Sequence, residues 1–318
     1  IRKKLYRRGC VVTRTEETMS GRYSNEVRPD GQKEGGSMRI GIIGAGRVGC
    51  SLGKYFRLKG AHLAGYYDAS AEASKEAAEF TQTDYFETLE QLVRESEILF
   101  ITTPDTWIVP VWEEIKGLSL TNQIICHCSG ALSSDSFSGS DDMGVSCCSV
   151  HPMLPFSNKF SSYEQLNKAF FTVEGQPRAV EVISRFLEAF GNEVCRIDGA
   201  CKPKYHAAAS ILSNHVIAVL DTGYRLLEEC GFSREEAVRA TAELVRRNVE
   251  NVLEKGCEEA LTGPIERMDT GTVQKHLDCL SSEDAGIYRA LGSRLADLAE
   301  KKHPGQDYDE MRRIMERK

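Results

Sequence analysis

The chain has 318 residues, of which 41% are hydrophobic and 27% are charged, and its formal net charge is −7. This composition is typical of a soluble protein with two folded domains. The sequence contains no run of eighteen apolar residues, so it predicts no membrane-spanning helix, and beyond residue 37 it offers no extended basic face for nucleic acid.

The number and spacing of the cysteines bear on the compartment and on metal binding. There are eleven, an odd number, without the regular spacing of a secreted disulfide framework, so we expect a reducing compartment and a cytoplasmic protein. The densest group of cysteine and histidine residues, between residues 126 and 151, lacks paired C-x-x-C motifs. No metal site is therefore expected.

Residues 1–37 differ in composition from the rest of the chain. They hold nine Lys or Arg against five acids and show no sustained hydrophobic period, which predicts a disordered leader. Two other interpretations are open. The segment is Arg-rich and free of acids up to Glu16, as organellar presequences are, and Met38 could instead mark the natural start.

Residues 38–198 alternate short β-rich runs with helical ones. This pattern predicts an α/β domain with a doubly wound parallel sheet. The predicted strands are 39–43, 63–67, 98–103, 123–127, 145–150, 169–173 and 193–197. The predicted helices are 48–58, 71–80, 89–95 and 178–190.

From residue 199 to residue 318 the sequence is almost wholly helical in pattern. Periodic stretches lie at 205–229, 234–254, 272–280 and 283–301. We expect an all-α domain that completes the substrate site. Its broad apolar faces, as at Ile211, Val216, Val219 and Leu220, predict a homodimer formed through this domain.

A glycine-rich run follows the first predicted strand. Gly44-Ala45-Gly46-Arg47-Val48-Gly49 has the spacing G-x-G-x-x-G between a strand and a helix. In that context the first glycine permits a tight turn, the second lets the backbone approach a pyrophosphate, and the third lets helix and strand pack closely. The run predicts binding of NAD(H) or NADP(H), with the pyrophosphate at the helix N-terminus.

Asp68 stands at the end of the second predicted strand, where a carboxylate can accept hydrogen bonds from the adenosine ribose. The carboxylate would repel a 2′-phosphate, and Ala69 and Ser70 provide no arginine to neutralise one. Asp68 therefore favours NAD. The alternative is that Asp68 is a simple turn residue.

Three loops are expected at the carboxyl edge of the sheet, where ligands of open α/β sheets bind. Thr103 and Pro104 end the strand at 98–103 and are predicted to contact the cofactor. Ser129 follows the next strand and could bind a substrate oxygen or the nicotinamide amide. His151 follows the strand after that and could orient a carboxylate or exchange a proton. Loop capping is the alternative for Ser129 and His151.

A polar stripe lies at the start of the helical domain. His206, Ser210 and Asn214 follow one another at i, i+4 spacing, and Lys202 precedes them by one turn. Polar groups on such a face need a ligand, a partner or solvent. We expect Lys202 or His206 to be the general acid of a carbonyl reduction. Asn214 would hold the substrate oxygen, and Ser210 would contact the substrate.

Arg267 lies in a non-periodic break between two predicted helices. Its planar guanidinium could bind a substrate carboxylate through two hydrogen bonds. An ordinary ion pair between subunits is the alternative.

Together these motifs resemble a family of Rossmann-like oxidoreductases with a helical C-terminal domain of unknown function. The resemblance covers nearly everything after Met38. It rests on the glycine-rich run and on the sequences HCSGALS from residue 127, VHPM from 150, YHAAA from 205 and ALTGPI from 260. Some members resemble an alternative type of ketopantoate reductase, and relatives include pyrroline-5-carboxylate reductases and 3-hydroxyacid dehydrogenases.

The resemblance implies roles for particular residues. In the relatives a lysine, with an asparagine or histidine one turn later, serves the carbonyl, and Lys202 with His206 matches that layout. Members often carry Ser and Arg after the second strand, which suits NADP, and they read Arg-Gly-Asp where this chain has Arg267-Met268-Asp269.

The leading prediction is an NAD(P)-dependent oxidoreductase that reduces a small 2-oxo acid, with 2-dehydropantoate as the best single substrate. The sequence around His151 also resembles prephenate dehydrogenases, and an imine of the pyrroline-5-carboxylate type is another candidate substrate. A third reading is a non-catalytic NAD(P)-binding sensor or scaffold, in which the polar stripe only seals a dimer interface.

Overall fold

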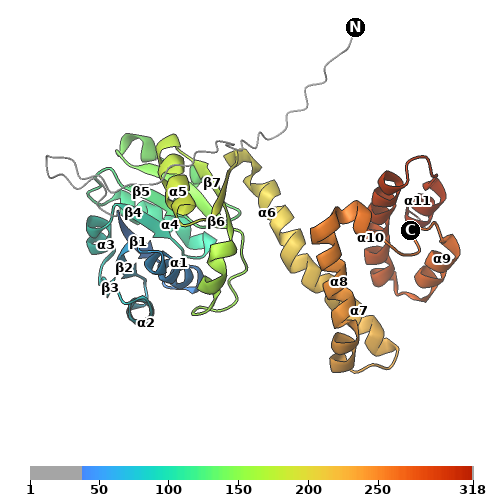
Figure 1. Cartoon of the computed structure of the whole chain (residues 1–318). Coiled ribbons are helices and arrows are strands. Elements are labelled where there is room, and N and C mark those ends of the chain that lie inside the picture. The colour runs from blue at the N-terminus through green and yellow to red at the C-terminus, as the bar shows by residue number, and fades with distance from the viewer. Residues whose placement is uncertain (1–37, 317–318) are drawn as a thin grey trace, which may run out of the picture. The chain divides into compact units, whose positions relative to one another are not determined.

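The computed structural model describes residues 38–316 (Figure 1). The predicted disordered leader, residues 1–37, lies outside the described residues. Within residues 38–316 no helix has both the length and the apolar character needed to cross a membrane.

The strands and α-helices agree with the sequence pattern in order and in type. The strands are β1 (Arg39–Ile43), β2 (His62–Tyr67), β3 (Asp84–Tyr85), β4 (Ile98–Ile101), β5 (Ile124–His127), β6 (Ser146–Pro152), β7 (Phe170–Gly175) and β8 (Glu193–Arg196). The helices are α1 (Arg47–Leu58), α2 (Ala71–Thr81), α3 (Leu89–Glu95), α4 (Asp105–Lys116), α5 (Pro177–Ala189), α6 (Lys202–Ser210), α7 (Val216–Glu229), α8 (Arg234–Ala260), α9 (Thr270–Cys279), α10 (Ser282–Lys302) and α11 (Asp309–Glu316). The pattern gave no range for the short strand β3, for α4 or for the last helix α11.

The eight strands form one sheet in the order β3-β2-β1-β4-β5-β6-β7-β8. This confirms the predicted α/β fold with a doubly wound sheet. One pair differs from the prediction, because β6 and β7 are antiparallel. The chain between them contains only a 3₁₀ segment, Ser162–Lys168, and antiparallel neighbours do not need a crossover helix.

Alternating side chains of the strands fill two separate cores. On one face, Ile42, Phe100 and Val150 pack with residues of α1, α2 and α5. On the other face, Ile43 and Ile101 pack with residues of α3 and α4. The sequences of these strands are therefore continuous apolar runs, which is typical of strands that are covered on both faces.

Local sequence fixes where several helices begin. Thr88 and Gln91 form a capping box at the start of α3, and Ser233 and Glu236 form another at the start of α8. In each box the two side chains satisfy backbone N–H groups that the helix leaves unpaired.

The described chain divides into two compact units between Ser213 and Asn214. We call them the α/β unit and the helical unit. The division falls later than the predicted domain boundary at residue 199, so that α6 belongs to the α/β unit. The predicted helix 205–229 is interrupted, because Ile211–His215 form a π-helical turn between α6 and α7.

The helical unit has a core formed by α9, α10, α11 and the loop before α9. Its largest members include Tyr308, Met311, Ile314 and Met315. Helices α7 and α8 contribute almost nothing to it, since none of Val216–Glu229 is buried and Ala237 is the one buried residue of Arg234–Ala260.

Candidate functional site

The glycine-rich turn has the shape that a dinucleotide needs. Gly44 has φ +100°, and its amide donates a hydrogen bond of 2.8 Å to the carbonyl oxygen of Tyr67 at the end of β2. A Cβ atom on Gly49 would lie 2.1 Å from the Gly44 carbonyl oxygen, so only glycine lets α1 start this close to β1. A Cβ atom on Gly46 would meet nothing within 4 Å. The backbone at Gly46 is therefore open to an approaching group.

The start of α1 offers donors to that group. Gly46 is the N-cap of α1 and has no side chain with which to cap the helix. The N–H groups of the first turn are thus left for a ligand, and the helix dipole favours an anion there. Arg47 is exposed in this first turn. The residues present fit the pyrophosphate of a dinucleotide.

Asp68 is tied to the glycine-rich turn. Its Oδ2 atom accepts a hydrogen bond of 2.7 Å from the Ala45 amide, and its Oδ1 atom accepts one of 2.9 Å from the Ser70 amide. A carboxylate oxygen has more than one acceptor position. Asp68 thus stabilises the turn, and its contact with a ribose stays a prediction.

The end of β4 closes the other side of the turn. The Thr102 hydroxyl donates to the Gly44 carbonyl oxygen at 2.7 Å. The Thr103 hydroxyl oxygen is buried and has no hydrogen-bond partner within residues 38–316. Pro104 is the N-cap of α4. Because α1 and α4 cover opposite faces of the sheet, β1 and β4 meet at a topological switch point, where ligands of such sheets bind.

Ser129 lies in the loop after β5, and its hydroxyl is fully used. It donates to Asp105 Oδ2 at 2.8 Å and accepts hydrogen bonds from the amides of Ala131 and Leu132 at 3.1 and 2.9 Å. The side chain holds the loop in place, as the capping interpretation expects. Its predicted contact with a ligand stays untested.

One sheet face carries a row of polar side chains at β5, β6 and β7. Period-two alternation brings them to this face, because their neighbours Cys126, Val150 and Val173 belong to the core on the opposite face. The row consists of His127, Ser149, His151, Thr172 and Glu174, which are paired between neighbouring strands. All except His151 are at least nine-tenths buried.

Lys202, the first residue of α6, inserts its ammonium group into this polar row. Its side chain is 1% exposed. The Nζ atom donates to the Ser129 carbonyl oxygen and to Ser149 Oγ, both at 2.7 Å. Burial lowers the pKa of Lys202, and the Glu174 carboxylate opposes that shift. The lysine is a fixed cation that joins α6 to the ends of β5 and β6.

His151 and Tyr205 form a pair beside Lys202. The Nδ1 atom of His151 lies 2.7 Å from the Tyr205 hydroxyl oxygen. Burial, with smaller contributions from Lys202 and His206, lowers the pKa of His151 to about 4. Burial also raises the pKa of Tyr205. At neutral pH the imidazole is therefore neutral and the phenol keeps its proton.

His206 completes this group from the next position of α6. It is exposed, and its ring centroid lies 6.4 Å from that of His151. The α/β unit thus brings together four predicted residues, namely Ser129, His151, Lys202 and His206. Ser210 is half-buried at the end of α6. Asn214 and Arg267 belong to the helical unit.

Comparison with protein families places two matches along the chain. Residues 25–152 match the family described as Rossmann-like domain. Residues 169–295 match the family described as Domain of unknown function, DUF2520. The chain joins a Rossmann-like domain to a DUF2520 domain. This confirms the resemblance on which the sequence prediction was based.

The two matched segments share the polar group. Ser129 and His151 lie in the Rossmann-like match, whereas Lys202, Tyr205 and His206 lie in the DUF2520 match. The DUF2520 match begins at residue 169, so it also includes β7, α5 and β8.

Solved structures show the same fold. Protein TM1727 from Thermotoga maritima is 23% identical, with a TM-score of 0.66 over 83% of this chain and 99% of that one. Protein BF3122 from Bacteroides fragilis, designated an NADP oxidoreductase, is 19% identical, with a TM-score of 0.65 over 82% and 98%. A 1-pyrroline-5-carboxylate reductase from Streptococcus pyogenes is 16% identical, with a TM-score of 0.58 over 83% and 98%. A search of curated proteins finds no match.

Sequence reasoning missed Tyr205, Ser149 and Glu174. Tyr205 follows Lys202 by three positions, which places both on one helix face. Ser149 and Glu174 stand at alternate positions of apolar strands, and that alternation was the available signal.

The DUF2520 segment also contains the turn with Arg267. Met268 has φ 57°, a left-handed conformation that favours glycine. Asp269 then caps α9 by accepting a hydrogen bond of 3.0 Å from the Thr272 amide. Arg267 is exposed, and its role as a carboxylate clamp stays a prediction.

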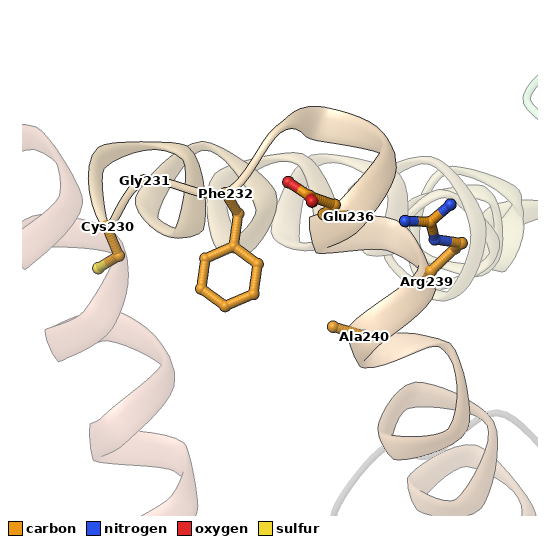
Figure 2. Close-up of a pocket in the computed structure, with 6 residues that line it drawn as sticks. All are labelled: Cys230, Gly231, Phe232, Glu236, Arg239 and Ala240. Carbon is orange, nitrogen blue, oxygen red and sulfur yellow. The ribbon is translucent and has the colours of Figure 1, made fainter.

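A cavity of about 570 Å³ lies in the helical unit, where α7 ends and α8 begins; Figure 2 shows the side chains that line it. It is lined by Cys230, Gly231, Phe232, Glu236, Arg239 and Ala240. None of the predicted site residues is among them, so this cavity is not part of the candidate site.

Proposed function

We propose that the protein is an NAD(P)-dependent oxidoreductase that reduces a small 2-oxo acid, with 2-dehydropantoate, giving pantoate, as the best single substrate. One observation carries the proposal. A glycine-rich turn that fits a pyrophosphate lies at the carboxyl end of β1, and the Lys202–His151–Tyr205 group lies at the carboxyl ends of β5 and β6 in the same sheet. The fold shared with an NADP oxidoreductase supports this proposal.

The polar group suits carbonyl reduction. When bound, the reduced nicotinamide supplies a hydride to the carbonyl carbon. Charge then builds on the carbonyl oxygen, and a cation fixed nearby stabilises it without having to reorganise. Lys202 is held in place by two hydrogen bonds and serves as that cation. Of the two acids predicted from sequence, exposed His206 is the better placed to exchange protons with solvent.

We propose that NADH binds more tightly than NADPH. The Asp68 carboxylate stands between the turn and the end of β2, and a 2′-phosphate there would meet its negative charge. Replacing Asp68 with Asn should reduce the preference for NADH by about tenfold, while the amide retains part of the hydrogen bonding. Calorimetric titration with both nucleotides measures the ratio. An unchanged ratio would remove Asp68 from the cofactor site.

A substrate screen tests the proposed reaction. 2-Oxo acids, including 2-dehydropantoate, are incubated with NADH and NADPH, and nicotinamide absorbance is followed. Cofactor binding is measured separately through Trp107, which is 60% exposed in the first turn of α4, whereas Trp112 is buried. Turnover of a 2-oxo acid supports the proposal. Tight binding without turnover of any compound contradicts it and favours a sensor or scaffold.

Imine reduction is a second candidate reaction, favoured by the fold shared with a 1-pyrroline-5-carboxylate reductase. An imine becomes more electrophilic when protonated, so the same neighbourhood of proton donors could serve it. Cyclic imines therefore belong in the same screen. Turnover of 1-pyrroline-5-carboxylate, without turnover of 2-oxo acids, would replace the first proposal by this one.

A further inference from the structure

Tyr205 lies close to both His151 and Lys202. Its hydroxyl oxygen lies 2.7 Å from His151 Nδ1 on β6, and the two rings meet edge to face with centroids 5.6 Å apart. Lys202 Nζ lies 5.8 Å from the centroid of the same ring. The phenol thus contacts an imidazole and lies near a buried cation.

The hydrogen bonds of Lys202 limit what the lysine can do. Two of its three N–H groups point to the Ser129 carbonyl oxygen and to Ser149 Oγ, and the side chain is 1% exposed. To reach a substrate the ammonium group would have to leave both acceptors unpaired in a buried place. Lys202 is therefore poorly suited to deliver a proton directly.

Tyr205 has neither limitation. It is partly exposed, and its phenol is protonated at neutral pH because burial raises its pKa. The neutral imidazole of His151 can carry its proton on Nδ1 and donate it to the phenol oxygen. In that tautomer the hydroxyl proton of Tyr205 is not taken by His151, so it can turn from the neighbouring Thr172 side chain toward a substrate.

We propose that Tyr205 is the catalytic residue that donates the proton to the substrate oxygen, with His151 and Lys202 as positioning residues. This inference rests on the proposed function. A bound reduced nicotinamide would supply a hydride to the carbonyl carbon and become oxidised, and the π electron pair of the carbonyl would move to oxygen. That oxygen takes the phenolic proton and becomes a hydroxyl group. The resulting tyrosinate is stabilised by His151 Nδ1–H and Lys202, and it regains a proton from water.

The test compares Tyr205→Phe with wild type and with Tyr85→Phe. Tyr205→Phe removes the hydroxyl group and keeps the ring next to Lys202. Tyr85 lies on the short edge strand β3 and is 40% exposed, so its substitution controls for the loss of a hydroxyl elsewhere. The assay uses 2-dehydropantoate with the reduced nicotinamide that wild type prefers, at saturating concentrations. Nucleotide affinity is measured by calorimetry, and the melting temperature is recorded for each variant.

In Tyr205→Phe, kcat should fall by about 10² to 10⁴, the range for a lost general acid. Nucleotide affinity should change less than about twofold. Tyr85→Phe should behave as wild type. If Tyr205→Phe keeps more than about a third of the wild-type kcat, the assignment is wrong. A loss of kcat that is matched by a loss of nucleotide affinity or of melting temperature also overturns it, because it indicates a structural role.

A second variant tests the pair if Tyr205→Phe does not fold. His151→Asn keeps the phenol and removes the ring that holds it, so kcat should fall by about tenfold with KM unchanged, and the pH profile should shift. If His151→Asn has the same kcat and the same pH profile as wild type, the proposal is wrong. If wild type binds nucleotide but reduces none of the screened compounds, the proposed function fails, and this inference fails with it.

Discussion

Backbone strain in this protein is found at single residues. Met268 is the clearest case of strain, since it adopts φ 57° without the freedom of glycine. We expect Met268→Gly to raise the free energy of unfolding by about 1 kcal/mol, because the left-handed conformation costs a side chain about that much. Met268→Ala, which keeps the Cβ atom, should bring no such gain. Denaturant unfolding of both variants measures the difference, and equal stability of Met268→Gly and wild type would contradict the argument.

At the scale of residues, the sequence did not predict the hydrogen-bond partners of Ser129 or the burial of Lys202. Ser129 was predicted from its place after β5, and the place is right, but its hydroxyl is already bound to Asp105 and to two amides. Lys202 is one of the two residues that the sequence predicts as the general acid, and its side chain is 1% exposed. Asp105 lies on α4, and the acceptors of Lys202 lie more than fifty residues before it, so the local pattern does not contain these partners.

At the scale of elements, the ends of β5 and β6 carry the buried His127 and the half-buried His151, and these make stability depend on pH. Burial lowers the pKa of His127 and of His151 from 6.5 to about 4. Between these values the unfolded chain binds more protons than the folded one, so the free energy of unfolding must fall as pH drops from 6.5 toward 4. Denaturant unfolding at pH 7, 5.5 and 4.5 should show this decrease. His127→Gln should weaken this dependence, and a wild-type stability that does not change with pH would contradict the lowered pKa of both histidines.

Most of the elements were predictable because their patterns are local. Strand β1 and helix α3 have the predicted bounds, and capping boxes and alternating apolar runs mark such elements without tertiary information. The antiparallel pairing of β6 with β7 was not predictable in this way. Strand direction depends on how the connecting chain packs, and that packing involves residues distant in sequence.

At the scale of the whole molecule, helices α7 and α8 expose apolar side chains that a folded chain normally covers. Ile217 is 67% exposed, Leu244 62% and Leu253 80%. We propose that a second copy of the chain covers them and that the protein is a homodimer. Leu253→Glu should then shift the dimer toward monomer in sedimentation equilibrium. Leu58→Glu, at a residue 65% exposed at the end of α1, should leave the mass unchanged. A monomeric wild type would refute the proposal.

The sequence by itself determined the Rossmann turn, the order of strands and helices, and the loops in which Ser129, His151, Lys202 and His206 lie. These follow from periodicity, glycine spacing and capping, which act over a few residues. Only the tertiary structure decided that Lys202 is buried between Ser129 and Ser149, and that Tyr205 meets His151. Such contacts join α6 to strand ends more than fifty residues earlier, so burial and partners, and hence pKa values, were fixed by the packing of the sheet against that helix.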